Sequence, residues 1–323
     1  ALSFSNLLLE LYIIPKSITA NNINKNIGSI KTNSIKAWIL AARPKTLAAA
    51  ATPVLLGCAL SYSDEVFQWT PALLCFLFAF SMQIDANFIN DYYDFLKGSD
   101  REDRLGPERA CAQGWITLSV MKKGILFTTL LSCFWGLLLL QYCGLEMIPV
   151  GLLCVLFAFL YTAGPYPLAY HGWGDLLVIV FFGFVPVGCT YYTMSHDWTW
   201  NVTIACMACG LVSDLLLMLN NYRDREQDKI SGKRTLIVRF GEPAGRWAYL
   251  LLGIIATGLC LLYSFSGRYA AALLPILFLI PHIVTWKQMI QIFKGKELNS
   301  VLGKTARNIV LFGLLVSLGL ILS

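Results

Sequence analysis

Long apolar runs recur along almost the whole chain, and they limit the folds open to it more than any other feature. A membrane-spanning helix needs about 20 mostly apolar residues. About nine stretches meet this need, at 46–62, 71–90, 124–142, 145–162, 173–194, 202–221, 246–266, 269–286 and 306–322. Only 14% of the 323 residues are charged, against about 25% in soluble domains. The sequence therefore predicts an all-α integral membrane protein.

The basic residues divide unevenly between the two sides of such a bundle. Every Lys and Arg except Arg268 lies before the first span or between spans two and three, six and seven, or eight and nine. Because Lys and Arg collect in cytoplasmic loops, these segments are predicted to be cytoplasmic. The net charge of +6 therefore reflects membrane topology rather than a surface that binds nucleic acid.

Residues 1–35 differ from the rest and are predicted to form a separate segment. Leu7–Ile14 is largely apolar but too short to span a membrane, and Ala20–Ser34 is rich in Asn and Lys. We interpret this part as a leader or surface helix followed by a polar linker. A cleavable signal peptide is the less favoured interpretation, because no clear small-residue cleavage site is present. The transmembrane domain is then expected to cover 36–323.

Two segments rich in Asn and Asp follow the second and sixth spans. They run from Asn90 to Asp100 and from Asn220 to Asp228, and their openings, N-D-Y-Y-D and N-N-Y-R-D, are consistent with an internal repeat. Residues four apart share a helix face, so Asp224 would stand beside Asp228. Carboxylates stacked in this way repel each other unless a cation such as Mg²⁺ joins them to phosphate oxygens. The two segments therefore predict a site for a diphosphate bound through Mg²⁺.

Basic residues surround both segments and could neutralise the remaining phosphate charge, since arginine can bind phosphate through two hydrogen bonds. For these residues alone, a solvated cytoplasmic loop remains the alternative. For the Asn/Asp segments function is favoured, because ionisable groups at membrane depth are usually functional. Asp85 and Asp214, deeper in the spans, either support the site or bond to neighbouring helices. The basic candidates are Arg43, Lys45, Lys97, Arg104, Arg109, Lys233 and Arg234.

A third loop, between spans four and five, has no Lys or Arg but gathers aromatic residues. Pro165 and Pro167 are expected to end the preceding helix. The polar aromatic side chains could dock an aromatic substrate, or they could form an interfacial aromatic belt. Both interpretations remain open. The candidates are Tyr161, Tyr166, Tyr170 and His171.

From about residue 36 to the C-terminus, the motifs resemble those of the UbiA superfamily of intramembrane aromatic prenyltransferases. The first signal of that family is N-D-x-x-D-x-x-x-D. Asn90, Asp91 and Asp94 match it, but glycine stands at the final position and the third acid is displaced to Asp100. This displacement is similar to the branch of the family that prenylates 1,4-dihydroxy-2-naphthoate.

The second family signal, D-x-x-x-D-x-x-x-G, is matched by Asp224, Asp228 and Gly232. A longer run, N-N-x-R-D-x-x-x-D-x-x-x-G-K-x-T-L, is matched from Asn220 to Leu236. This longer run also resembles the 1,4-dihydroxy-2-naphthoate polyprenyltransferases, the MenA-type branch.

The resemblance implies about nine helices around a central cavity, with Mg²⁺ as the cofactor and the active site at the cytoplasmic face of a membrane of the bacterial inner-membrane type. The acids would withdraw charge from the diphosphate through the metal. The implied catalytic residues are Asp91, Asp94, Asp224 and Asp228. The implied metal ligands are these four together with Asn90, Asp100 and Asn220.

The implied substrates are a polyprenyl diphosphate, drawn from the lipid bilayer, and 1,4-dihydroxy-2-naphthoate. Their reaction releases CO₂ and diphosphate and gives demethylmenaquinol for menaquinone biosynthesis. No obligatory protein partner is evident. Two alternatives remain: a prenyltransferase of this family for another aromatic acceptor, and a transporter of anionic lipids or metabolites. Transporters also carry repeats and midplane charges, but here the acids gather at one membrane face.

Overall fold

The computed structural model describes residues 30–100 and 104–323, and this part of the chain is helical, without strands. Most of the predicted N-terminal segment, residues 1–29, lies outside the described residues, so the predicted boundary near residue 35 stays a prediction. The helices are α2 (Ile35–Ala42), α3 (Pro44–Ser63), α4 (Trp69–Leu96), α5 (Leu118–Cys143), α6 (Ile148–Thr162), α7 (Gly174–Ile179), α8 (Cys189–Ser195), α9 (Trp200–Ile230), α10 (Leu236–Phe240), α11 (Glu242–Cys260), α12 (Tyr269–Leu273), α13 (Leu279–Ile292) and α14 (Leu298–Ile321).

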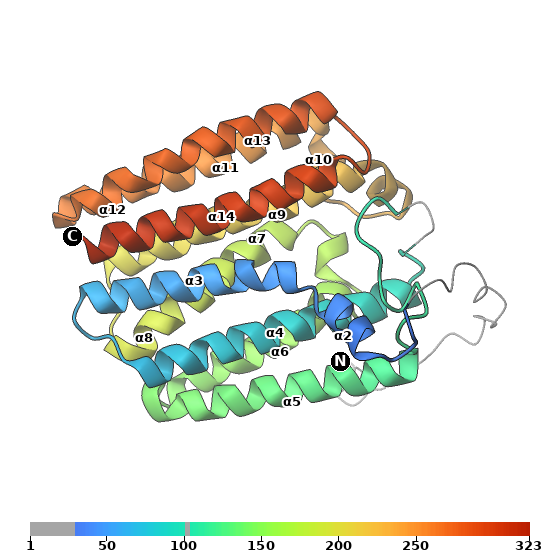
Figure 1. Cartoon of the computed structure of the whole chain (residues 1–323), viewed down its shortest axis with the longest axis horizontal. Coiled ribbons are helices and arrows are strands. Elements are labelled where there is room, and N and C mark those ends of the chain that lie inside the picture. Colours follow the sequence, from blue (N-terminus) through green and yellow to red (C-terminus); the bar gives the residue numbers. More distant parts are fainter. Residues whose placement is uncertain (1–29, 101–103) are drawn as a thin grey trace, which may run out of the picture.

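The predicted number of spans is confirmed: the described residues contain nine helical segments long and apolar enough to cross a membrane. The long helices lie side by side, with α2 and α10 at one end of the bundle and α8 and α12 at the other (Figure 1). Two helices reach beyond the apolar runs, since α4 continues to Leu96 and α9 to Ile230. Asn90 to Asp94 and the whole second Asp segment are therefore helical.

The fifth span is not a regular helix. Between α7 and α8 it widens into a π-helical stretch, Val180–Gly188, that contains Pro186. Proline lacks an N–H and clashes with the preceding turn, which accounts for the local change in helix winding. This span packs closely on α9, where a Cβ at Gly210 would lie only 2.8 Å from the carbonyl oxygen of Ile179. Glycine is therefore the residue that allows the two backbones to approach.

Two buried clusters hold the bundle together. The larger one joins α9, α11 and α14 and contains the fully buried Tyr222 and Tyr249. The smaller one joins α2, α4 and α5. Within the bundle, the buried carboxylate of Asp85 on α4 accepts hydrogen bonds from Thr128 and Thr129 on α5. This acid has partners on the neighbouring helix, as burial of a charged group requires.

A cavity of about 510 Å³ opens between α3, α4, α5, α6 and the fifth span. Most of its walls are apolar, including Phe78, Phe157 and Phe181. Its lining follows α4 from Cys75 to Asn90, a length of about 22 Å at the usual helical rise. The cavity therefore leads from the apolar body of the bundle to the beginning of the first Asp segment.

Candidate active site

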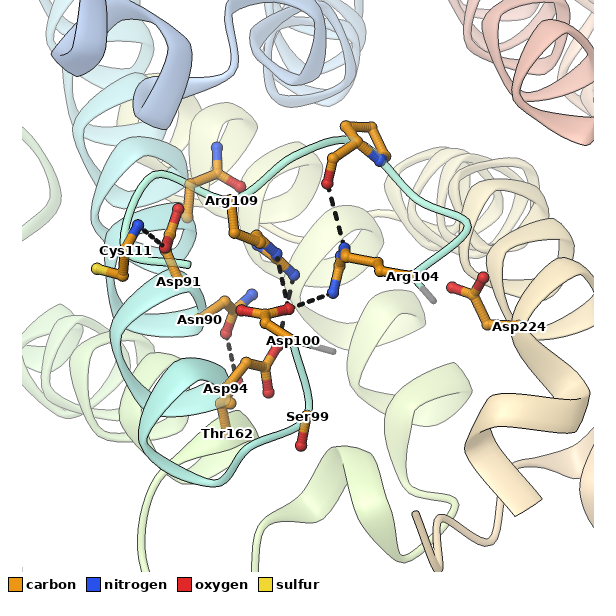
Figure 2. A network of polar contacts seen from close by, with 12 residues as sticks. Asn90, Asp91, Asp94, Ser99, Asp100, Arg104, Arg109, Cys111, Thr162 and Asp224 are labelled. Carbon is orange, nitrogen blue, oxygen red and sulfur yellow. Dashed lines mark hydrogen bonds and ion pairs between the residues drawn. The ribbon is translucent and has the colours of Figure 1, made fainter. Parts of the chain in front are cut away.

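Asp91 lies on α4 but does not face its Asp-segment neighbours. Its two carboxylate oxygens each accept a hydrogen bond, at 2.9 Å, from the backbone N–H groups of Ala110 and Cys111. Figure 2 shows its side chain directed toward Cys111, away from Asp94 and Asp100. The position follows from helix geometry, because Asp91 is one residue out of register with the face shared by Asn90 and Asp94. Asp91 thus fixes the loop that follows α4.

That loop supplies two arginines to the remaining acids of the first segment. Arg109 Nη2 lies 3.4 Å from Asp94 Oδ2, and Arg109 Nε lies 3.7 Å from Asp100 Oδ1. Arg104 donates to the same oxygen of Asp100, and Figure 2 shows both arginines converging there. Burial raises the pKa of Asp100 to about 7, although Arg104 acts in the opposite direction. The second oxygen of this carboxyl group, Oδ2, is buried without a hydrogen-bond partner.

Asn90 is held by the end of α6. Its side-chain oxygen accepts a hydrogen bond from the hydroxyl of Thr162, and the carbonyl oxygen of Thr162 accepts one from Lys97 Nζ. Asn90 also lines the cavity. Thr162 was not among the predicted site residues, because a single threonine at the end of an apolar run carries no signal of its own.

The second segment is held by neighbours in its own helix. Arg223 forms two hydrogen bonds to the carboxylate of Asp224, with Nε–Oδ1 at 2.7 Å and Nη2–Oδ2 at 2.6 Å. Asn220, Asp224 and Asp228 follow at intervals of four residues and so share one helix face. Asn220 is half-buried. The sequence motif contains Arg223, but the predicted site residues did not include it.

A residue of the last helix connects the two halves of the site. Asn299 accepts a hydrogen bond from Arg223 Nη1 at 2.7 Å, and its Nδ2 donates to the carbonyl oxygen of Leu105 at 2.8 Å. Leu105 belongs to the loop that also carries Arg104 and Arg109. Asn299 therefore ties the second Asp segment to the loop that serves the first. No sequence signal marks it, since it is an isolated amide far along the chain.

Lys233 links the two segments electrostatically. Its Nζ lies 3.4 Å from Asp228 Oδ1. Burial alone would lower the pKa of Lys233, but the carboxylates of Asp228 and Asp94 raise it above its ordinary value. Because Asp94 belongs to the first segment, the charges of the two segments act on one ammonium group.

The other predicted basic residues separate into two groups. Arg43 stands between α2 and α3 in the left-handed region, with φ of 52°, and its Nη1 donates to Asn87 Oδ1 at 3.4 Å. Burial lowers its pKa, and its Nη2 has no hydrogen-bond partner. Lys45 and Arg234 have exposed side chains. Arg43 is thus the better placed of the three to contact a buried anion.

The four aromatic candidates also occupy different places. Tyr161 lines the cavity. Tyr166 is 55% exposed and its ring stacks on His171, with centroids 3.5 Å apart. Tyr170 is half-buried between the two Asp segments, with Lys97 and Lys233 near its ring. Among the described residues, Tyr161 is the one member of this group on the cavity wall.

The sequence pattern of the UbiA prenyltransferase family matches residues 50–301, well over half of the chain. This chain belongs to that family. The match covers both Asp segments, the loop after α4 and every residue that lines the cavity. The membrane-embedded UbiA architecture predicted from the motifs is therefore confirmed.

Curated UbiA relatives align over nearly the whole chain. The 1,4-dihydroxy-2-naphthoate octaprenyltransferase of Haemophilus influenzae is 34% identical over 299 residues, covering 89% of this chain and 96% of the relative. The enzyme of the same name from Escherichia coli is 34% identical over 300 residues, with the same coverage. A UbiA homolog from Archaeoglobus fulgidus bound to GPP and Mg²⁺ superposes with a TM-score of 0.65 over 89% of this chain and 100% of that chain, at 16% identity. At this identity the likeness concerns the fold.

The donor groups of this UbiA chain fit Mg²⁺ in their chemistry, since the segments offer carboxylate and amide oxygens, and Asp100 Oδ2 is buried without a partner. Within residues 30–100 and 104–323, no three His, Cys, Asp or Glu side chains converge as a ready metal cluster. Mg²⁺ usually takes only one or two carboxylates and completes its shell with water and substrate phosphates. The donor set therefore suits an ion that arrives with a diphosphate.

Proposed function

We propose that this chain transfers a polyprenyl group from an allylic diphosphate to 1,4-dihydroxy-2-naphthoate, releasing diphosphate and CO₂, and so forms demethylmenaquinol for menaquinone biosynthesis. The observation that carries the proposal is the apolar cavity that ends at Asn90, beside two acidic segments and their cations. The two relatives described above, at 34% identity, support the naphthoate as the acceptor.

The cavity and the Asp segments divide the work of binding. The apolar walls accept the prenyl chain, which removes its surface from water. Asn90, Asp94, Asp224 and Asp228 would hold the metal, with Asp100 and Asn220 as further donors. When bound, Mg²⁺ withdraws charge from the diphosphate and improves it as a leaving group.

The basic residues complete the binding of the diphosphate. Arg109 and Lys233 already lie beside the acids, and Arg43 has an unpaired nitrogen that can donate to a phosphate oxygen. Cations fixed in advance around the leaving group stabilise the charge that develops on it. The same proposal assigns Asp91 to holding the arginine-bearing loop, because its two oxygens are occupied by backbone N–H groups.

In the chemical step, the allylic C–O bond breaks and its electron pair leaves with the diphosphate. The electron-rich ring then forms the new C–C bond at the carbon that bears the carboxyl group. Loss of CO₂ returns an electron pair to the ring, so this route needs no separate base to remove a ring proton. The apolar cavity walls protect the allylic cation from water.

The site is assigned to the cytoplasmic side of a bacterial-type inner membrane. Both Asp segments adjoin loops that the distribution of Lys and Arg along the sequence predicts to be cytoplasmic. Arg268, on the opposite side, pairs with Asp64.

The test uses the purified chain in lipid nanodiscs with a polyprenyl diphosphate, 1,4-dihydroxy-2-naphthoate and Mg²⁺. We expect a prenylated naphthoquinol and equimolar CO₂, both abolished by a metal chelator and restored by Mg²⁺. The absence of product under these conditions would reject the proposal. A transporter would instead move its ligand across sealed vesicles without forming a product.

The choice of acceptor is tested by competition. We expect the naphthoate to be consumed in preference to 4-hydroxybenzoate and homogentisate when all three are supplied together. Preferential prenylation of either competitor would retain the prenyltransferase but replace the acceptor.

A further inference from the structure

The ring of Tyr170 contacts two lysines, one from the first Asp segment and one from the residues that follow the second. Lys97 Nζ, in the first segment, is 5.1 Å from the ring centroid. Lys233 Nζ, which follows the second, is 4.9 Å from the same centroid. Both distances are within the range of a cation–π contact, in which the negative face of the ring attracts an ammonium group. One aromatic ring is thus shared by a cation from each half of the site.

Tyr170 is itself fixed by both halves. Its hydroxyl is hydrogen-bonded to the hydroxyl of Ser99, in the first segment. Its carbonyl oxygen accepts a hydrogen bond from the backbone N–H of Arg234 at 2.8 Å, in the turn that follows the second segment. These contacts leave the ring little freedom to turn toward another ligand.

The two lysines have different surroundings, since Lys233 is half-buried and Lys97 is exposed. Lys233 Nζ lies 3.4 Å from Asp228 Oδ1, and Lys97 Nζ donates a hydrogen bond to the carbonyl oxygen of Thr162 at the end of α6. Two ammonium groups in one place repel each other, and flexible lysine side chains would otherwise extend into water. A ring that contacts both ammonium groups offsets part of this repulsion and reduces the number of positions that each can adopt.

We propose that Tyr170 is a positioning residue that holds Lys97 and Lys233 together at the diphosphate site, and that it does not contact the aromatic acceptor. The inference rests on the proposed prenyltransferase function, because it takes the diphosphate as the shared ligand of the two lysines. It replaces the prediction that Tyr170 docks the aromatic substrate.

The first test separates the ring from its hydroxyl. Tyr170→Phe keeps the ring, whereas Tyr170→Leu removes both groups. Affinity is measured for a prenyl thiolodiphosphate, a non-reacting analogue, in the presence of Mg²⁺. Because Tyr170→Leu loses two cation–π contacts, we expect it to bind the analogue roughly 5- to 30-fold more weakly than the wild type. The affinity of Tyr170→Phe should stay within about twofold of the wild type, because the ring remains. Steady-state kinetics should show the same rise in KM for the diphosphate and an unchanged KM for the naphthoate.

A second test asks whether Tyr170 acts through the lysines. In a chain that carries Lys97→Met and Lys233→Met, adding Tyr170→Leu should cause no further loss of affinity for the analogue. This comparison is a double-mutant cycle, which isolates the interaction between Tyr170 and the two lysines. Tyr269→Leu, an exposed tyrosine at the opposite end of the bundle, is the matched control and should leave affinity unchanged.

A third measurement avoids any loss of folding. Phenylalanine analogues with one, two or three ring fluorines at position 170 weaken the negative face of the ring with little change in size, so affinity should fall stepwise with each fluorine. An unchanged diphosphate affinity across this series, or a raised KM for the naphthoate alone in Tyr170→Leu, would overturn the inference. Failure of the wild-type chain to bind the analogue would instead overturn the proposed function.

Discussion

The two Asp segments resemble each other in sequence but are stabilised in different ways. Asp91, Asp94 and Asp100 of the first segment are held by groups from the following loop, including Arg109. In the second segment, Asp224 is paired with the adjacent Arg223. The first segment therefore depends on a loop that must close onto α4, whereas the second carries its main cation within α9.

This difference shows that a repeated motif does not imply a repeated environment. Asp100 of the first segment is also more enclosed than Asp224 of the second, with side-chain exposure of 1% against 27%. Burial without full pairing leaves the first segment with unsatisfied groups, such as Asp100 Oδ2. We therefore expect substitutions at distant residues to disturb the placement of the acids more in the first segment than in the second.

We expect the largest effect from removing one acid of each segment, which tests whether both segments bind the same diphosphate. Asp94→Asn and Asp228→Asn should each lower kcat by roughly 100- to 1,000-fold, because each removes charge stabilisation that acts on the leaving group. The measurement is the rate of prenylated product at saturating substrates and Mg²⁺.

The matched control is Glu226→Gln, since this residue lies on α9 between the two acids of the second segment and its side chain is 74% exposed. Its turnover should equal that of the wild type. Full activity in only one of the Asp variants would show that the two segments act independently.

A smaller effect is expected from Asp91→Asn. This variant separates the role of Asp91 in holding the loop from that of Asp94 in holding the metal. The variant leaves one backbone N–H facing an NH₂ group, which costs about 2 kcal/mol. We expect a lower Tm and about a tenfold loss in kcat/KM. A misplaced loop that raises the activation free energy by about 1.4 kcal/mol gives a factor of that size.

The Mg²⁺ concentration for half-maximal activity distinguishes positioning from metal binding. It should be unchanged in Asp91→Asn but raised in Asp94→Asn. A raised Mg²⁺ requirement in the Asp91 variant would instead support the prediction that Asp91 is a metal ligand.

The connection between the segments predicts a still smaller effect for Asn299→Ala. The change leaves Arg223 Nη1 and the Leu105 carbonyl oxygen without their partner, at a cost of about 1 kcal/mol. We expect roughly a fivefold loss in kcat/KM for the diphosphate by the same relation. Ser300→Ala, at the exposed neighbouring position, should behave as the wild type. Equal kinetics for the two variants would argue against a link through α14.

The smallest effect is expected at Arg234, which the sequence analysis placed among the diphosphate-binding cations. Its side chain is exposed, and exposed charges contribute little and are screened by salt. Arg234→Gln should raise the KM for the diphosphate about twofold at low ionic strength, with no change at high salt. Lys233→Gln should have a larger effect that persists in salt, because Lys233 is partly buried beside Asp228. Similar salt-sensitive effects in both variants would show that the two cations are equivalent.

The sequence predicted the bundle well because apolar length and the distribution of Lys and Arg act over whole segments. It predicted the nine spans and the two Asp segments at the ends of α4 and α9. It placed the helix ends too early, since polar residues at Asn90 to Asp94 remain helical beyond the apolar run. The helix continues there because its polar face is covered by the loop that follows.

The contacts within the site were less predictable because they depend on three-dimensional proximity. A motif treats Asp91 and Asp94 alike, yet helix register turns one toward backbone amides and the other toward Arg109. Asn299 and Thr162 reach the site from α14 and the end of α6, far from either motif in sequence. A single isolated amide or hydroxyl carries no pattern that predicts such a contact.

The cavity described above is lined entirely by residues up to Thr193, so within the described chain α11, α12 and α13 contribute nothing to its wall. These helices instead pack on α9 and α14 and turn side chains such as Trp247 and Ile280 outward. Protein engineering can exploit this separation. Stabilising substitutions on the outward-facing positions of α11 to α13 would leave the substrate path intact.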